Sequence, residues 1–247
     1  MKLLLIIILS ILIGACQKEN DAVKQQAIDY EEIGKLHNEG LDYVLKQIKN
    51  QPKTRNGGKQ ISFELIYSMV DQFLETKGFQ PNHVTRSSVQ TPIDSITLSP
   101  KQKKYYDMVM SVFDTSSTLN EQQAINYIIK IEEEIRINCS KTEQLPLLCG
   151  SSIAKHTIVY WSEKLPEWIN EIIGDKKPST RSANWSWKDF GGADVAGAVS
   201  GAIAGAIGGA FIGGVGAAPG AVVGGVGVGI GSSAGYAAQK LWDWIWD

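Results

Sequence analysis

The residues of this chain that could perform acid–base or metal chemistry are spaced in ways that favour no known site. His37 and His156 fall on apolar faces of helical periodicity, where a histidine is more often a hydrogen-bonded core residue than a ligand, and His83 lies in a proline-containing loop. The glutamates at 31–32 do not form the E-x-x-H or H-E-x-x-H spacing of helical metal sites with His37. The glutamates at 132–134 point about 100° apart on a helix and predict a solvated face.

These patterns, and the lack of a phosphate-binding P-loop, predict that the chain is not an enzyme and uses no cofactor or metal. A formal net charge of −2 over 247 residues gives no basic field for nucleic acid. Composition changes sharply along the chain: 17 of the 25 glycines lie from Gly191 to Gly235, and no charged residue lies between Asp194 and Lys240. The chemistry to expect is therefore lipid anchoring and helix packing.

The chain begins MKLLLIIILSILIGAC, a basic residue followed by a short apolar run. At 1.5 Å per residue this run reaches about half of the bilayer core, so it predicts a signal peptide over residues 1–15 and not a stable span. Its end, Ile13-Gly14-Ala15-Cys16, resembles the lipobox of bacterial lipoproteins. The resemblance implies acylation of Cys16, with residues 16–27 as an acylated tether; an ordinary secretory signal with a chance cysteine is the alternative.

The polar residues after Cys16 resemble the export signal of Bacteroidota surface lipoproteins. Gln17 stands where many lipoproteins that stay in the inner membrane have an aspartate. The resemblance implies a lipid-anchored protein of the outer membrane, facing the periplasm or the cell surface.

Cys139 and Cys149 are the cysteines that remain when Cys16 is acylated. An even pair in an exported protein predicts a disulfide bond, which would close a loop of about ten residues and contribute roughly 2–3 kcal/mol. Two free, buried thiols are the alternative. A metal site is not expected here, because no histidine or second cysteine pair has ligand spacing.

Residues 28–174 have the periodicity of amphipathic helices, and no alternating run of strand length competes with it. The expected helices cover residues 33–48, 66–74, one segment from 100, one from 121, 147–165, and a short segment that Pro166 begins. A loop is expected over residues 79–98. The predicted fold class is all-α: a helical bundle domain followed by a helical hairpin.

Local signals mark three of the expected helix ends. Ser99 with Gln102, and Asn120 with Gln123, have the spacing of capping boxes at helix starts. Gly78 is placed to end the second helix, because glycine readily adopts the left-handed conformation found just after a helix.

The C-terminal segment, residues 191–247, follows a charged linker over residues 175–190 and predicts a glycine-zipper hairpin. Small residues recur there at strict four-residue spacing: Gly197, Gly201, Gly205, Gly209, Gly213, Ala217, Ala221, Gly225 and Gly229. Such a row forms a groove in which two helix backbones can approach closely. Pro219-Gly220 predicts a turn between two arms, residues 195–216 and 220–239, each about as long as a bilayer core is thick.

Tryptophans flank this segment where a membrane-interface belt would lie: Trp185, Trp187, Trp242, Trp244 and Trp246. The Gly/Ala-rich segment resembles the zipper regions of class II bacteriocins and of outer-membrane glycine-zipper lipoproteins. Residues 33–41 (IGKLHNEGL) resemble helical Bacteroidota lipoproteins to which no activity is attached.

Two non-enzymatic hypotheses follow. In the first, the hairpin inserts into or oligomerises at a membrane, as a bacteriocin-like effector or a structural envelope component; its partners are membrane lipid and further copies of the chain. In the second, the lipid-anchored helical domain binds a protein partner, and the hairpin only packs on itself or on that domain.

Overall fold

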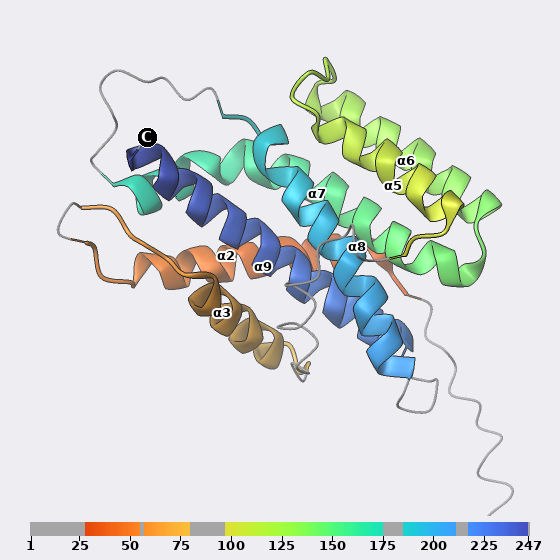
Figure 1. The fold of residues 1–247 in the computed structure, drawn as a ribbon, viewed down its shortest axis with the longest axis horizontal. Helices are drawn as coiled ribbons and strands as arrows, with labels where there is room; N and C mark the ends of the chain where they lie inside the picture. The colour runs from red at the N-terminus through yellow and green to blue at the C-terminus, as the bar shows by residue number, and fades with distance from the viewer. Residues whose placement is uncertain (1–27, 55–56, 80–96, 175–184, 211–216, 247) are drawn as a thin grey trace, which may run out of the picture.

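The computed structural model describes residues 28–54, 57–79, 97–174, 185–210 and 217–246, which form an all-α bundle (Figure 1). Its helices are α2 (Tyr30–Lys49), α3 (Phe63–Thr76), α5 (Pro100–Met110), the 3-10 helix η2 (Ser111–Phe113), α6 (Glu121–Asn138), α7 (Lys141–Ile173), α8 (Lys188–Ala210) and α9 (Ala217–Trp246). No strand occurs in these ranges. The all-α prediction is confirmed. The signal peptide, Cys16 and the tether lie outside the described residues.

The local signals at helix ends act as the sequence predicts. In both predicted capping boxes the cap side chain accepts from the N3 backbone N–H and the N3 side chain accepts from the cap backbone, with Ser99 and Gln102 opening α5 and Asn120 and Gln123 opening α6. Gly78, just beyond α3, has a φ of +80°, a conformation that glycine adopts without a steric penalty.

The expected break at Pro166 is wrong, because α7 runs without interruption from Lys141 to Ile173. A proline inside a helix removes one hydrogen bond and costs about 3 kcal/mol. Trp161 and Trp168 lie on either side of Pro166 and are both fully buried. Packing of large side chains on both halves of the helix outweighs the local penalty.

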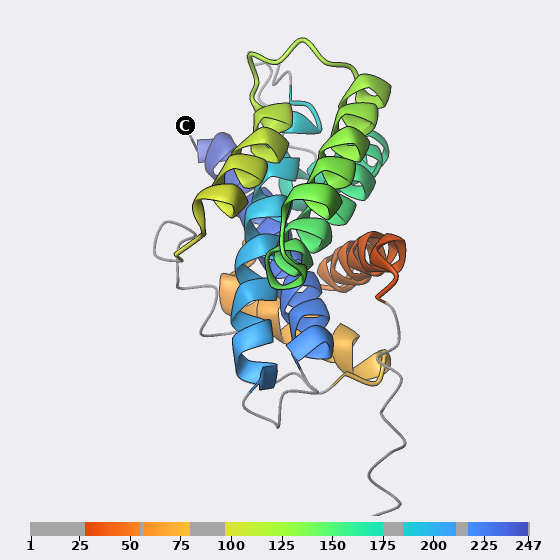
Figure 2. The same cartoon turned by 90° about the vertical axis from the view of Figure 1, so that its right-hand side faces the viewer.

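The helices form layers on either side of α7 and α9 (Figures 1 and 2). Helices α5 and α6 pack against α7 on one side, and α2 and α3 lie on the other, where both contact α9. Helix α8 packs along α9 and also contacts α7. One continuous apolar core includes side chains from all of these helices, so the glycine-rich helices share a core with the rest of the chain.

The expected turn at Pro219-Gly220 is also wrong, because both residues lie in the first turn of α9. Proline is tolerated there, since the first backbone N–H groups of a helix have no partner within it. The connection between α8 and α9 is therefore earlier in the chain, over residues 211–216. These residues, which include Gly213 of the predicted row, lie outside the described residues.

The predicted disulfide is absent: Cys139 and Cys149 are both free and buried. Helix α7 begins at Lys141, two residues after Cys139, so Cys149 lies eight residues farther along it. At 1.5 Å per residue that is about 12 Å, whereas the Cα atoms of a disulfide are usually about 4.4–6.8 Å apart. The helix start carries the second cysteine away from the first.

Candidate membrane-active helix pair

Glycine backbones of α8 and α9 are in direct contact. A Cβ atom at Gly201 would lie 2.1 Å from the carbonyl oxygen of Gly224, and one at Gly205 would lie 2.0 Å from that of Gly220. At Gly197 it would lie 2.7 Å from the carbonyl oxygen of Val228. No side chain fits at these positions unless the two backbones move apart. Three of the predicted packing glycines therefore line the α8–α9 contact.

The remaining glycines of the predicted row do not all face the same partner. Gly225 lies beside this contact, against Ala198 and Ala202, and Gly229 faces His37 of α2 and the backbone of Asp194. A strict four-residue spacing advances by about 40° per step around a helix of 3.6 residues per turn. A long row therefore turns from one neighbour to the next. Gly209 lies in α8, and its surroundings are not described.

Small residues on the other faces of α9 admit large side chains from α2 and α3. A Cβ at Gly231 would lie 2.0 Å from the ring of Tyr67, and one at Gly235 would lie 2.3 Å from the ring of Phe63. Gly40 of α2 leaves room in the same way for Ile230 of α9. Burial raises the pKa of the Tyr67 hydroxyl to about 12. Glycine therefore fits α9 into the bundle as well as against α8.

By length and composition, two helical segments could cross a membrane: Lys188–Ile207 in α8 and Ala218–Trp244 in α9. Both are mostly buried in the bundle. The far end of α8 is an exception, because the side chain of Ile207 is 58% exposed. That end of α8 and the beginning of α9 extend at the lower right in Figure 1, beyond α5 and α6.

The tryptophans lie at the opposite end of the pair. The rings of Trp185 and Trp244 are 5.0 Å apart, and Trp187 is buried, with its ring edge-on to Phe113 at 5.7 Å. Trp242 lies against Gly58. These residues cluster at one end of the pair, as the sequence suggests, but Trp187 is a core residue. The side chain of Trp246 is not described.

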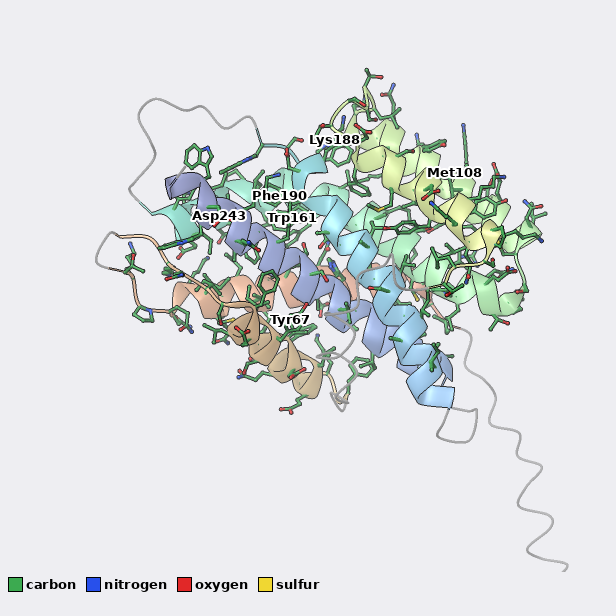
Figure 3. The ribbon with its side chains drawn as sticks, viewed as in Figure 1. Tyr67, Met108, Trp161, Lys188, Phe190 and Asp243 are labelled. Atoms are coloured by element: carbon green, nitrogen blue, oxygen red, sulfur yellow. The ribbon has the colours of Figure 1, made fainter. Side chains whose placement is uncertain are left out.

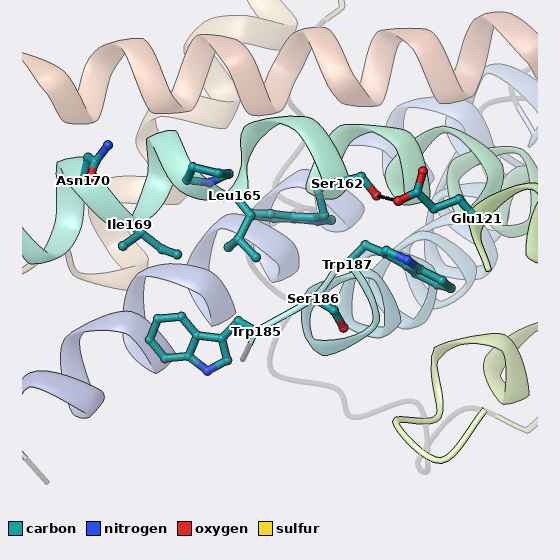
Figure 4. A pocket seen from close by; sticks show the side chains of 10 residues that line it. Glu121, Ser162, Leu165, Ile169, Asn170, Trp185, Ser186 and Trp187 are labelled. Atoms are coloured by element: carbon teal, nitrogen blue, oxygen red, sulfur yellow. Dashed lines mark hydrogen bonds between the residues drawn. The ribbon is translucent and has the colours of Figure 1, made fainter. Parts of the chain in front are cut away.

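A pocket of about 420 Å³ opens between α7 and the segment that leads into α8 (Figure 4). Trp185 and Trp187 line one wall, and Leu165 and Ile169 line the other. At its edge the hydroxyl of Ser162 donates to Glu121 at 2.7 Å. The pocket is open and of mixed polarity. It lies beside residues 185–187, the segment directly before α8.

Among the described residues of the pair, the buried charged group is Asp194, whose side chain is fully enclosed. Its carboxylate receives hydrogen bonds from Thr157 and from the indole N–H of Trp161, at 2.8 Å for the latter, and lies 3.3 Å from His37 Nε2. Trp161 also stacks on Phe190 at 4.9 Å, between α7 and α8 (Figure 3). Sequence reasoning missed this group; its signal was a lone charge at the start of an apolar helix.

A second polar cluster joins α2, α6 and α7. Lys155 binds the carboxylates of Glu31 and Glu132, and His156 Nε2 lies 3.0 Å from the other oxygen of Glu31. Burial lowers the pKa of Lys155, but the two carboxylates outweigh it and raise that pKa overall. Burial raises the pKa of Glu132. The predicted solvated face is therefore wrong at Glu132, which is buried as the partner of Lys155.

Two spacings typical of serine hydrolases also occur in the sequence: S-x-x-K at Ser152–Lys155 and G-x-S-x-G at Gly231–Gly235. The fold uses neither in that way. Ser152 is fully buried in α7 and donates to the carbonyl of Tyr30, while Lys155 is bound by carboxylates. Ser233, the central serine of the second, is fully buried inside α9, not at the strand-to-helix turn on which that motif depends.

Neither a protein-family model nor a curated protein nor a solved structure matches the chain.

Proposed function

We propose that this protein is a lipid-anchored, non-enzymatic component of the bacterial outer membrane that holds a membrane-active helix pair inside its bundle. The observation that carries the proposal is the pairing of α8 and α9: two neighbouring helices of bilayer length with no charge from residue 195 to 239. In hydrocarbon a glycine-rich backbone must remain helical, because its polar groups have no other partners. The glycine contacts between the helices persist in either environment.

The position of the chain's beginning supports the proposal. Helix α2 begins on the side of the bundle toward which the uncharged end of α8 extends (Figures 1 and 2). The twelve residues from Cys16 to Ile28 can span about 40 Å when extended. A tether of that length, anchored by an acyl group on Cys16, would therefore allow the exposed Ile207 to reach the membrane surface.

Insertion requires the helix pair to separate from α2, α3 and α7. Helix α9 is the more deeply buried of the two. The face of α9 that carries Gly231 and Gly235 is covered by side chains of α3, and this favours the second hypothesis, in which the bundle does not open. In that alternative the anchored bundle binds a protein partner. Removal of residues 185–247 does not separate the two functions, because it would take out part of the shared core.

Two exposed isoleucines give a matched test that leaves the core intact. Ile207 lies at the end of α8, and Ile137, which is 81% exposed, lies on α6. Each is replaced by cysteine, in a chain whose Cys139 and Cys149 are alanine, and labelled with an environment-sensitive dye. In vesicles of outer-membrane lipid, the dye at 207 should report hydrocarbon and the dye at 137 should report water. Water at both positions contradicts insertion and favours the closed bundle.

The anchor is tested separately by Cys16→Ala. Metabolic labelling with a palmitate analogue should modify the wild-type protein and not the variant, and the variant should leave the detergent phase. Equal labelling of the two proteins contradicts the lipoprotein assignment.

A further inference from the structure

Asp194 is the only charged residue between Asp189 and Lys240, and the uncharged stretch of the pair begins directly after it. Its neighbours at the two ends behave differently: Asp189 and Lys240 bind each other at 3.1 Å near the surface. Asp194 is fully buried, in the second turn of α8. A buried carboxylate is unfavourable unless several partners compensate it.

The partners of Asp194 come from helices other than its own. One carboxylate oxygen accepts hydrogen bonds from Thr157 and Trp161 of α7, and the other faces His37 of α2. The side-chain amide of Asn38 donates to the carbonyl of His156, so its oxygen faces His37 Nδ1 at 3.2 Å. Both ring nitrogens of His37 thus face side-chain oxygen atoms.

The contact between His37 Nε2 and Asp194 Oδ1, at 3.3 Å, lacks hydrogen-bond alignment, and neither atom has another hydrogen-bond partner among the described residues. Gly229 of α9 leaves room for the imidazole at this point, because a Cβ there would lie 3.1 Å from His37 Cδ2. Helices α2, α7, α8 and α9 therefore meet around one carboxylate.

We infer that Asp194, with His37, Thr157 and Trp161, is a latch that holds α8 in the bundle and opposes its entry into lipid. The inference rests on the proposed function and names its regulation. In the bundle the carboxylate has partners on α2 and α7. In hydrocarbon the same carboxylate loses them and becomes the most unfavourable residue of the segment. Asp194 thus favours the bundle over the inserted state in two ways: its contacts stabilise α8 in the bundle, and its charge is unfavourable in the membrane.

The test compares variants by the dye at position 207. Asp194→Asn removes the charge and keeps the size of the side chain. It should raise the fraction of protein that inserts into vesicles by about tenfold, since an aspartate is among the most unfavourable residues in a membrane helix, although less so in the second turn than at the centre. Asp189→Asn is the matched control on the same helix. It removes a carboxylate outside the uncharged stretch and should leave insertion unchanged.

Thr157→Val distinguishes a latch from general destabilisation. It removes one hydrogen bond to Asp194 but keeps the charge, so insertion should rise less than with Asp194→Asn, even where urea unfolding shows an equal loss of stability. If Asp194→Asn does not fold, Thr157→Val should still insert to a greater extent than the wild type. If its insertion does not increase, the latch is refuted. Equal insertion of the two variants at equal stability also overturns it.

Failure of the latch and failure of the proposed function give different results. If the wild-type dye enters lipid and Asp194→Asn changes nothing, the latch is wrong and the proposed function stands. If no variant enters lipid, both are wrong. Insertion of the wild type together with greater insertion of Asp194→Asn supports both.

Discussion

Replacing glycine by alanine at two positions of α8 should have opposite effects on stability. At Gly205 the new Cβ would lie 2.0 Å from the carbonyl oxygen of Gly220, and the helices would have to separate by about 1.4 Å for that contact to reach 3.4 Å. At Gly192 the nearest atoms are 3.6 Å and 3.7 Å away, which is ordinary contact. The substitution is chemically the same, and only the neighbouring atoms differ.

The magnitudes follow from two terms. Alanine gains about 1 kcal/mol over glycine inside a helix. Overpacking costs about 1–3 kcal/mol, and at Gly205 the upper end applies, because a backbone carbonyl cannot rotate away as a side chain does. Gly205→Ala should therefore lose about 2 kcal/mol of unfolding free energy, and Gly192→Ala should gain up to about 1 kcal/mol. For a chain of this size the melting temperatures should differ by roughly 10 °C.

The assay is thermal and urea unfolding followed by circular dichroism, in the non-acylated Cys16→Ala background. Gly192→Ala should melt above the parent protein and Gly205→Ala below it. If Gly205→Ala melted at or above the temperature of Gly192→Ala, the close contact of the α8 and α9 backbones would be refuted, and the four-residue spacing would reflect composition alone.

Three further outcomes are expected. Cys139 and Cys149 are both free and buried, and burial raises the pKa of Cys149 to about 12. Both thiols should therefore alkylate slowly in the native protein and completely in denaturant without reductant. If mass spectrometry finds them protected until they are reduced, the disulfide is present after all. A hydrogen bond from the Ser99 hydroxyl and two from Ser140 lower the pKa of Glu143 from 4.5 to about 2. Its contribution to stability should therefore be present above pH 4.5 and lost as the pH falls toward 2, and Glu143→Gln should abolish that part of the pH dependence of urea unfolding. Ile207→Asp should leave the unfolding free energy within about 0.5 kcal/mol, because the side chain is mostly exposed, yet reduce dye leakage from vesicles; unchanged leakage would exclude this end of α8 from the membrane.

The sequence predicts the local structure well where local chemistry decides it. The capping boxes at Ser99 and Asn120 and the glycine end at Gly78 form as predicted, because each depends on residues within one turn. The break expected at Pro166 does not form, because the local penalty of a proline is smaller than the stabilisation from packing Trp161 and Trp168 on either side of it. Such packing is set by the tertiary structure and is not encoded in the neighbouring residues.

The glycine row shows the same limit. Its spacing predicts close helix contact, and Gly197, Gly201 and Gly205 make that contact. The spacing does not reveal that Gly229 faces His37 of α2 as well as the backbone of α8, because that depends on which helices surround α9. Asp194 is visible in the sequence as a single charged residue, but the sequence does not show that side chains of α2 and α7 surround its carboxylate.

A reversible lock on α8 tests most directly whether the helix pair leaves the bundle. A Cβ at Gly192 would lie 3.7 Å from the Cβ of Phe113, within the range of disulfides, so Phe113→Cys with Gly192→Cys can tie α8 to η2 beside Asp194. In a chain whose Cys139 and Cys149 are alanine, a photoactivatable lipid is crosslinked in vesicles, and modified peptides are located by mass spectrometry. Residues 195–239 should crosslink in the reduced protein and not in the oxidised one. Equal crosslinking in both forms, or none in either, would contradict the account.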